Sequence, residues 1–239
     1  MAQWVTKSNY EVTNGNYFVK SHGKWYADAC GTAFAMELVG ERWSMLIIRE
    51  LMLGGRRFSD LRASLPGISA KVLTERLAGL ENAGVLVRRK LPPPSASQVY
   101  ELTEWGYFAE PAIQELGRWA ARSPEHNPQL PISPVSFMLS LRTMIDHEAA
   151  KAFDVSVGFT VSGESFLAEL RDGSMPVSRA EPGAGEINFA ADVPLALLRL
   201  FYGKQPLEEA ETAGVGFSGD RVLAERFVAL FALPPKIGG

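Results

Sequence analysis

Residues 65–90 read LPGISAKVLTERLAGLENAGVLVRRK and contain the signals of a helix followed by a strand. The Pro-Gly pair at 66–67 predicts a turn, and Ser69 is typical of the residue that caps a helix, here expected to run to Asn82. Gly84 favours the end of that helix. At about 100° per residue, three leucines fall within about 60° of one another and predict one buried face. They are Leu73, Leu77 and Leu80.

The opposite face of this helix is short and polar in its N-terminal half. A helix that lies in the major groove of DNA needs such a face, because long apolar side chains would collide with the base edges. The candidate DNA-binding residues on this helix are Ser69, Lys71, Thr74, Glu75 and Arg76.

The neighbouring segments complete a recognisable set of elements. Apolar spacing predicts earlier helices over 29–39, 44–53 and 58–65, and strands over 85–89 and 98–102 joined by a polar, proline-rich tip. Thr103 is expected to cap one last helix that reaches residue 120. Helices, a turn, a polar-faced helix and a basic hairpin together are the components of a winged helix.

Charge is unevenly distributed along the chain. The net charge is −3 overall, yet residues 56–90 hold 8 basic and 3 acidic side chains. This local excess fits a phosphate-contacting surface, for which the further candidates are Arg56, Arg57, Arg88, Arg89 and Lys90. The alternative, that these side chains are ordinary solvated surface on a plain amphipathic helix, stays open on pattern alone.

Residues 27–123 resemble the HxlR family of bacterial regulators. The similarity lies in CGTAFAMELVGERW (30–43), RFSDLR (57–62), LPGIS (65–69), KVLTERL (71–77), LENAGVLV (80–87), YELT (100–103) and LGRW (116–119). The resemblance implies a homodimer that binds double-stranded operator DNA through the fourth helix, and a two-fold dimer would match palindromic half-sites. It also implies an interface made by the first and last helices, for which the candidates are Trp105, Phe108, Leu116 and Trp119. The lack of a secretory pattern and of a membrane-length apolar run predicts a cytoplasmic protein.

Two departures from the family pattern are Gly31, where proline is usual, and the extension at 1–26, which has no assigned role. Cys30 is the only cysteine. In several members of the family the matching cysteine senses electrophiles or oxidants, and a helix N-terminus favours the thiolate. The alternative is a small buried packing residue.

Residues 124–133 are proline-rich and predict a semi-rigid linker. After them, an α+β domain is expected over 134–239, with strands at 153–161, 165–170 and 187–191 and helices at 134–145, 194–202, 206–213 and 220–231. This domain resembles the sterol-carrier-protein-like fold in FLAELRDG (166–173), LEEA (207–210) and FSGDRVL (217–223). The resemblance implies an apolar cavity between sheet and helices for a small apolar effector.

Several classes of function receive no support. The chain has no membrane-length apolar run and no secretory leader pattern, and its three scattered histidines predict no metal site. GVGFSG (214–219) has dinucleotide-motif spacing but follows a predicted helix instead of a strand, so we expect neither an enzyme nor a cofactor. The rival to a DNA-binding regulator is a carrier of lipids or aromatic compounds whose N-terminal domain serves mainly for dimerisation.

Overall fold

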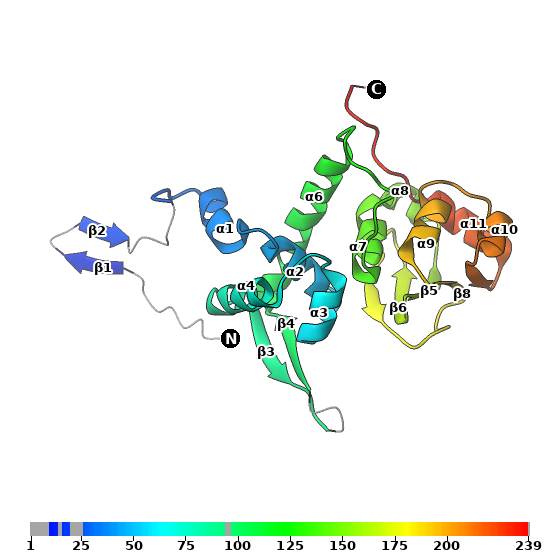
Figure 1. Cartoon of the computed structure of the whole chain (residues 1–239). Coiled ribbons are helices and arrows are strands. Elements are labelled where there is room, and N and C mark those ends of the chain that lie inside the picture. Colours follow the sequence, from blue (N-terminus) through cyan, green and yellow to red (C-terminus); the bar gives the residue numbers. More distant parts are fainter. Residues whose placement is uncertain (1–9, 14–15, 20–25, 94–96, 239) are drawn as a thin grey trace.

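The structure is a computed structural model that describes residues 10–13, 16–19, 26–93 and 97–238. It has a helical N-terminal part with a projecting two-stranded ribbon, and a C-terminal part built on a five-stranded sheet (Figure 1). The predicted α+β class and the winged-helix order of elements in the N-terminal part are confirmed. No helix among the described residues is long and apolar enough to cross a membrane.

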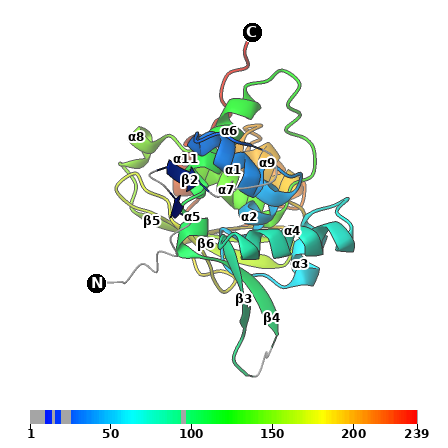
Figure 2. The same ribbon diagram turned by 90° about the vertical axis from the view of Figure 1, so that its left-hand side faces the viewer.

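The winged helix follows the expected sequence of elements. Its helices are α1 (Gly31–Val39), α2 (Ser44–Leu51), α3 (Phe58–Ser64) and α4 (Ala70–Asn82). The ribbon consists of β3 (Leu86–Lys90) and β4 (Gln98–Leu102), paired antiparallel with Arg88 opposite Tyr100. Figure 2 shows this ribbon pointing away from the helices. Part of the predicted tip, residues 94–96, lies outside the described residues.

The core of this part lies where the apolar faces of the helices meet. Leu73, Leu77 and Leu80 of α4 are buried, as their spacing predicts, against Ile47 and Leu51 of α2. Burial of several large aliphatic side chains, each contributing about 1.5–3 kcal/mol, holds α4 with its polar face outward.

The single last helix of the sequence prediction is wrong. The structure has a short α5 (Glu104–Tyr107), capped by Thr103 as expected, and a separate α6 (Glu110–Ala121). Pro111 explains the break, because its nitrogen has no proton to donate to the carbonyl of Tyr107 and its ring collides with that carbonyl in a continuous helix. In the first turn of α6, proline is well tolerated.

The C-terminal part has more elements than the sequence predicted. Its helices are α7 (Pro134–Met144), α8 (His147–Ala150), α9 (Pro194–Phe201), α10 (Leu207–Thr212) and α11 (Arg221–Ala229). Its strands are β5 (Val155–Val161), β6 (Glu164–Leu170), β7 (Val177–Arg179), β8 (Ile187–Ala191) and β9 (Gly216–Ser218), in the order β7-β6-β5-β8-β9. Only the β5–β8 pair is parallel.

Phenylalanine fills the layer between this sheet and its helices. Phe159 and Phe189 of the sheet lie 5.7 Å apart, and both contact Phe201 of α9. Phe201 in turn lies 5.3 Å from Phe231, and these four rings are at most 1% exposed. The sterol-carrier-like resemblance placed an apolar cavity in this layer, but a ligand there would have to displace these rings.

The two parts share one hydrophobic core. Residues 122–133, all described, form neither helix nor strand, as expected of the linker. This segment leads into α7, which is largely buried and packs against α2 and α6. The C-terminal tail also returns to α6, where the Lys236 ammonium donates to the carbonyl oxygens of Ala121 and Ser123 at 2.9 Å each.

Within the N-terminal extension, the structure describes two short strands and Tyr26. Strands β1 (Tyr10–Thr13) and β2 (Asn16–Val19) pair antiparallel, with Tyr10 opposite Val19. The sequence analysis assigned no element there.

Candidate nucleic-acid interface

The N-terminal half of α4 presents a polar, accessible face. The Ser69 hydroxyl accepts a hydrogen bond from the backbone N–H of Val72 at 3.2 Å, which caps the helix. Lys71 has 86% of its side chain exposed, and its ammonium lies 4.0 Å from the Glu75 carboxylate. Thr74 is exposed, and its hydroxyl donates to the carbonyl of Ala70 at 2.9 Å, so the oxygen still has a lone pair to accept with.

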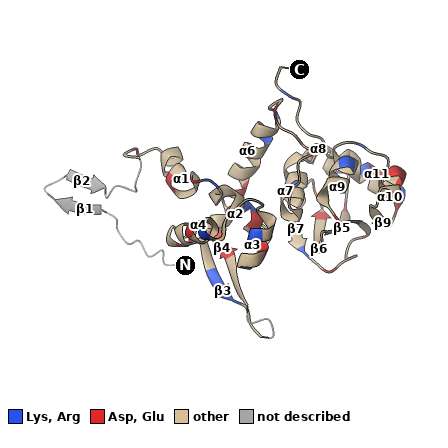
Figure 3. Cartoon of the chain, in the orientation of Figure 1, with Lys and Arg blue, Asp and Glu red and all other residues tan. Residues whose placement is uncertain are grey.

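The basic residues of the ribbon are held by carboxylates of the same chain. Arg88 forms a 2.6 Å ion pair with Glu81 at the end of α4, and Arg89 pairs with Glu101 on β4. Hydrogen bonding to these carboxylates raises the pKa of both guanidinium groups above the usual value. Lys90 is exposed beside them. Figure 3 shows the blue patch that these residues form on β3.

Arg56 does not belong to this surface, and its prediction as a phosphate contact is wrong. The residue is only 6% exposed. Its guanidinium donates to Glu50 of α2 at 3.4 Å and to Glu164 of β6 at 2.8 Å. A buried guanidinium with two carboxylate partners is a structural ion pair between the two parts of the chain.

The remaining two arginines of the prediction differ in environment. Arg57 is exposed before α3, and its Nε donates at 3.1 Å to the hydroxyl of Ser97, which directly precedes β4 at the loop end of the ribbon. Arg76 is half-buried and pairs with Glu41 in the segment between α1 and α2. The geometry therefore groups Arg57 with the ribbon, whereas Arg76 faces α1.

A second accessible surface consists of large apolar side chains on α5 and α6. Phe108 is 70% exposed and Trp119 is 74% exposed, and Trp105 and Leu116 are also exposed. All four are the residues predicted for a dimer interface. Exposed large apolar side chains of this kind are typical of surfaces that bind a partner.

Cys30 occupies the N-cap position of α1 and is exposed. The interpretation as a buried packing residue is therefore wrong. The backbone N–H of Ala33, followed by the backbone and side chain of Thr32, lowers the pKa of the thiol below its ordinary value. Among the described residues, no group of histidine, cysteine, aspartate and glutamate side chains is arranged to hold a metal ion.

Two glutamates that sequence reasoning missed explain the position of Arg56. Glu50 is fully buried and accepts from the Ser133 hydroxyl at 2.7 Å as well as from Arg49 and Arg56. Glu164 also binds Arg179 at 2.8 Å. No local pattern reveals these contacts, because the partners are up to 108 residues apart in sequence.

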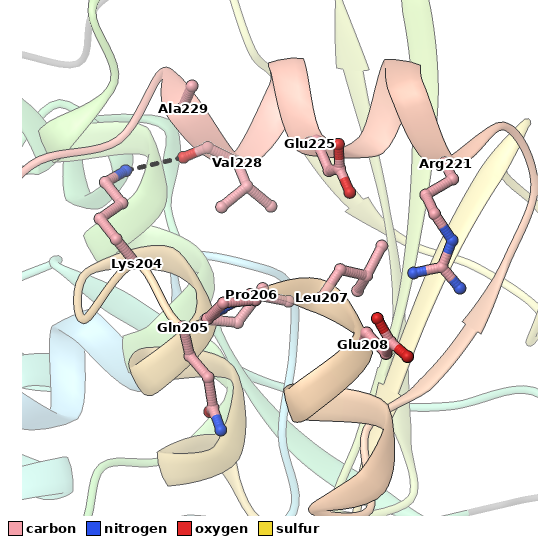
Figure 4. A pocket seen from close by; sticks show the side chains of 10 residues that line it. Lys204, Gln205, Pro206, Leu207, Glu208, Arg221, Glu225, Val228 and Ala229 are labelled. Atoms are coloured by element: carbon pink, nitrogen blue, oxygen red, sulfur yellow. Dashed lines mark hydrogen bonds between the residues drawn. The ribbon is translucent and has the colours of Figure 1, made fainter.

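A crevice in the C-terminal part was also missed. It has a volume of about 640 Å³ and lies between α11 and the segment that joins α9 to α10 (Figure 4). The Lys204 ammonium donates to the carbonyl of Val228 at 2.9 Å, and Arg221 pairs with Glu211 at 2.7 Å. Lys204 and Arg221 therefore already have partners within the chain. We interpret the crevice as a gap left by helix packing and not as a binding site.

Comparison with known proteins assigns the N-terminal part. The family model described as HxlR-like helix-turn-helix matches residues 38–128. The HTH-type transcriptional regulator YvaP of Bacillus subtilis is 38% identical over 86 residues, which is 36% of this chain and 80% of that protein. The chain belongs to the HxlR-like helix-turn-helix family.

Other HTH-type transcriptional regulators are also similar to part of this chain. YodB of Bacillus subtilis is 41% identical over 86 residues (36% of this chain and 77% of that protein), and YtfH of Escherichia coli is 34% identical over 97 residues (41% and 77%). The solved structure of the reduced form of YodB covers 41% of this chain and 97% of its own, with 37% identity and a TM-score of 0.37. These relatives are named as transcriptional regulators, which is compatible with the expectation that the chain is not an enzyme.

The HxlR-like match ends at residue 128. It therefore covers α2 to α6 with the ribbon, and it leaves most of α1, the five-stranded sheet and α7 to α11 outside the matched residues. The sterol-carrier-like interpretation of residues 134–239 remains a prediction.

Proposed function

We propose that the chain is a sequence-specific transcriptional regulator that binds a palindromic operator as a homodimer. The observation that carries this proposal is the exposed polar face of α4, from Ser69 to Glu75, beside a ribbon that bears Arg88, Arg89 and Lys90. In this arrangement α4 reads base edges in the major groove, and the ribbon contacts phosphates.

The roles follow from the geometry of each side chain. Lys71 and Thr74 contact bases, because they are exposed polar groups in the N-terminal half of α4. Arg57, Arg88, Arg89 and Lys90 contact phosphates. When DNA binds, phosphate oxygens replace the carboxylates of Glu81 and Glu101 as the partners of Arg88 and Arg89. Each arginine therefore has an anionic partner both with and without DNA.

The homodimer is supported by the apolar surface of α5 and α6. A two-fold axis that pairs Trp119 and Phe108 with the partner's matching surface places two copies of α4 on one side of the dimer. Two such helices fit half-sites about one helical turn apart, roughly 34 Å.

Two further parts of the proposal concern signals. Cys30 senses electrophiles or oxidants, supported by its exposure and by the lowered pKa of its thiol. Residues 134–239 form a sterol-carrier-like domain, supported by a mixed sheet covered by helices. The phenylalanine layer disfavours an effector inside that domain and with it the alternative of a lipid or aromatic carrier.

The test is a fluorescence anisotropy titration of the full chain with duplex DNA from upstream of its own gene. Unrelated duplex of equal length serves as the control. We expect tighter binding to the upstream DNA, by at least about 10³-fold, and a steep loss of affinity between 50 and 200 mM salt, as is general for specific regulators. Equal affinity for both duplexes would overturn the proposal.

A further inference from the structure

A hollow of about 740 Å³ lies where the two parts of the chain meet. It is bounded by α2, α6, α7 and α9, and residues of the linker and the C-terminal tail close one side. Most of its lining is apolar: Met45, Leu46, Ile113, Leu139, Leu198 and Leu233. We call it the interdomain pocket. Its volume falls within the range of about 300–1,000 Å³ that is typical of sites for small molecules.

Polar side chains also line the pocket, and two of their hydroxyls form a pair. The hydroxyls of Ser140 on α7 and Tyr202 at the end of α9 are 2.7 Å apart, and both residues line the pocket. Two hydroxyls carry two protons, and their mutual bond uses one, so one O–H is available to donate. Within the described chain, neither oxygen has another hydrogen-bond partner. Burial raises the pKa of the Tyr202 phenol, which therefore stays neutral.

The charged residues at the pocket favour a neutral occupant. Arg49 is paired with Glu50 at 2.8 Å, and Glu110 is paired with Arg142 at 2.8 Å. Burial and the nearby Lys236 ammonium lower the pKa of His126, which favours its uncharged form. An ionic ligand would have to compete with these pairs at Arg49 and Glu110, whereas a neutral one leaves them intact; Glu125, the remaining carboxylate of the lining, is exposed to solvent.

The predicted dimer surface and the pocket share one residue of α6, Leu116. On α6, Gly117 and Ala121 face the pocket and lie about 160° around the helix from Trp119. A partner that covers Trp119 and Phe108 therefore approaches α6 from the other side and reaches the pocket at Leu116.

We propose that the interdomain pocket binds one small, neutral molecule with an apolar body and a single hydroxyl, amine or carbonyl group, which pairs with Ser140 and Tyr202. Such an occupant contacts α6 of the winged-helix part together with α7 and α9 of the C-terminal part. The proposal goes beyond DNA binding, since the site is complete within one chain and its occupancy is measured without DNA.

The test uses N-phenyl-1-naphthylamine, a neutral aromatic amine that becomes fluorescent in apolar sites, titrated into the full chain. We expect saturable binding of one molecule per chain. Gly117→Phe fills the pocket and is expected to weaken binding at least tenfold. A Cβ at Gly117 meets no atom within 4 Å, and replacing a glycine inside a helix does not endanger folding.

The matched control is Gly79→Phe on α4, where a Cβ also meets no atom within 4 Å and which lies outside the pocket. Gly79→Phe adds the same phenyl ring to a helix, but outside the pocket. It is therefore expected to bind the probe as tightly as the unmodified chain. Tyr202→Phe removes the phenol hydroxyl and is expected to weaken binding about three- to tenfold.

Three results would overturn the proposal. One is the absence of saturable binding to the unmodified chain. Another is equal binding by Gly117→Phe, which would place the probe on the exposed aromatic surface. The third is that Gly117→Phe dissociates into monomers, as measured by light scattering. This result would mean that a second copy of the chain, and not a small molecule, occupies the pocket. None of these readouts depends on whether the chain binds DNA.

Discussion

Lys71 and Thr74 are the residues on which sequence discrimination depends. Replacing either by alanine is expected to lower the preference for operator over unrelated DNA by about 1–3 kcal/mol, the range for a well-made base contact. The ratio of the two dissociation constants, measured by anisotropy, reports this change. Lys151→Ala is the matched control, because Lys151 is an exposed, carboxylate-paired lysine at the end of α8 in the C-terminal part. An unchanged ratio in both α4 variants would show that α4 does not read bases.

Arg88 and Arg89 have a different expected effect. Replacing both by alanine leaves two phosphates without their cationic partners, so affinity falls for operator and unrelated DNA alike. The slope of log K against log salt should become shallower by about 0.9 for each phosphate that is no longer neutralised. Arg221→Ala provides the control, because it removes an exposed, glutamate-paired arginine from α11. A weakening confined to the operator would instead assign the ribbon a role in base recognition.

Cys30 should react as a thiolate at lower pH than an ordinary cysteine. Its thiol pKa is depressed by the start of α1, so the anionic form begins to accumulate below the usual value of 9.0. Alkylation by iodoacetamide, followed by mass spectrometry between pH 6 and 10, is expected to show a midpoint below that of a cysteine-containing peptide. Coincident midpoints would remove the basis for a sensing role.

Among single residues, the exposed positions could be predicted from the sequence, whereas the buried charged residues could not. The period of the leucines on α4 places Lys71 and Thr74 outward without any knowledge of the fold. Arg56 stands next to Arg57 in a basic stretch, and only the packing of β6 against this region shows that it is buried. Its partner Glu164 is distant in sequence, so no local pattern distinguishes the two arginines.

The helix α6 carries the surface on which the dimer depends. Trp119→Glu places a charge in the centre of an apolar interface, so we expect dissociation to monomers, measured by light scattering at micromolar concentration. Val222→Glu is the control, because Val222 is an exposed apolar residue on α11, away from this surface. A Trp119→Glu protein that keeps the mass of a dimer would move the interface elsewhere.

Long, periodic elements were predictable, and short ones were not. The bounds of α4 and β8 agree with the expected segments, because each has a clear apolar period and end signals. Strands β7 and β9 have three residues each, too few to show an alternation, and they exist because they pair with the edges of the sheet. The break at Pro111 was visible in the sequence but was overridden by the apolar spacing around it.

In the whole molecule, the buried ion network joins the two parts. Arg56→Ala removes one of the two arginine partners of Glu50 and one of the two of Glu164, so we expect the free energy of unfolding to fall by about 1.5–3 kcal/mol, the range for hydrogen bonds to charged groups. Urea denaturation followed by circular dichroism measures this change. Arg62→Ala, an exposed arginine on α3, is the control and should cost little. A decrease below about 1 kcal/mol for Arg56→Ala would mean that the network contributes little to stability.

The relation between the two parts was the least predictable feature. The prolines of 124–133 predict a linker, and its lack of helix or strand agrees with that. Nothing in that segment reveals that α7 is buried on both sides or that Lys236 returns to the end of α6. These contacts form only when the whole chain has folded, and they create the interdomain pocket.

The most direct test of DNA reading by α4 is dimethyl sulfate protection of the operator, which probes N7 of guanine in the major groove. With α4 of each protomer in the groove, we expect two protected clusters whose centres are about 10 base pairs apart. Lys71→Ala should weaken the protection in both clusters. Operator bound at saturation with every guanine N7 still reactive would contradict insertion of α4 into the major groove.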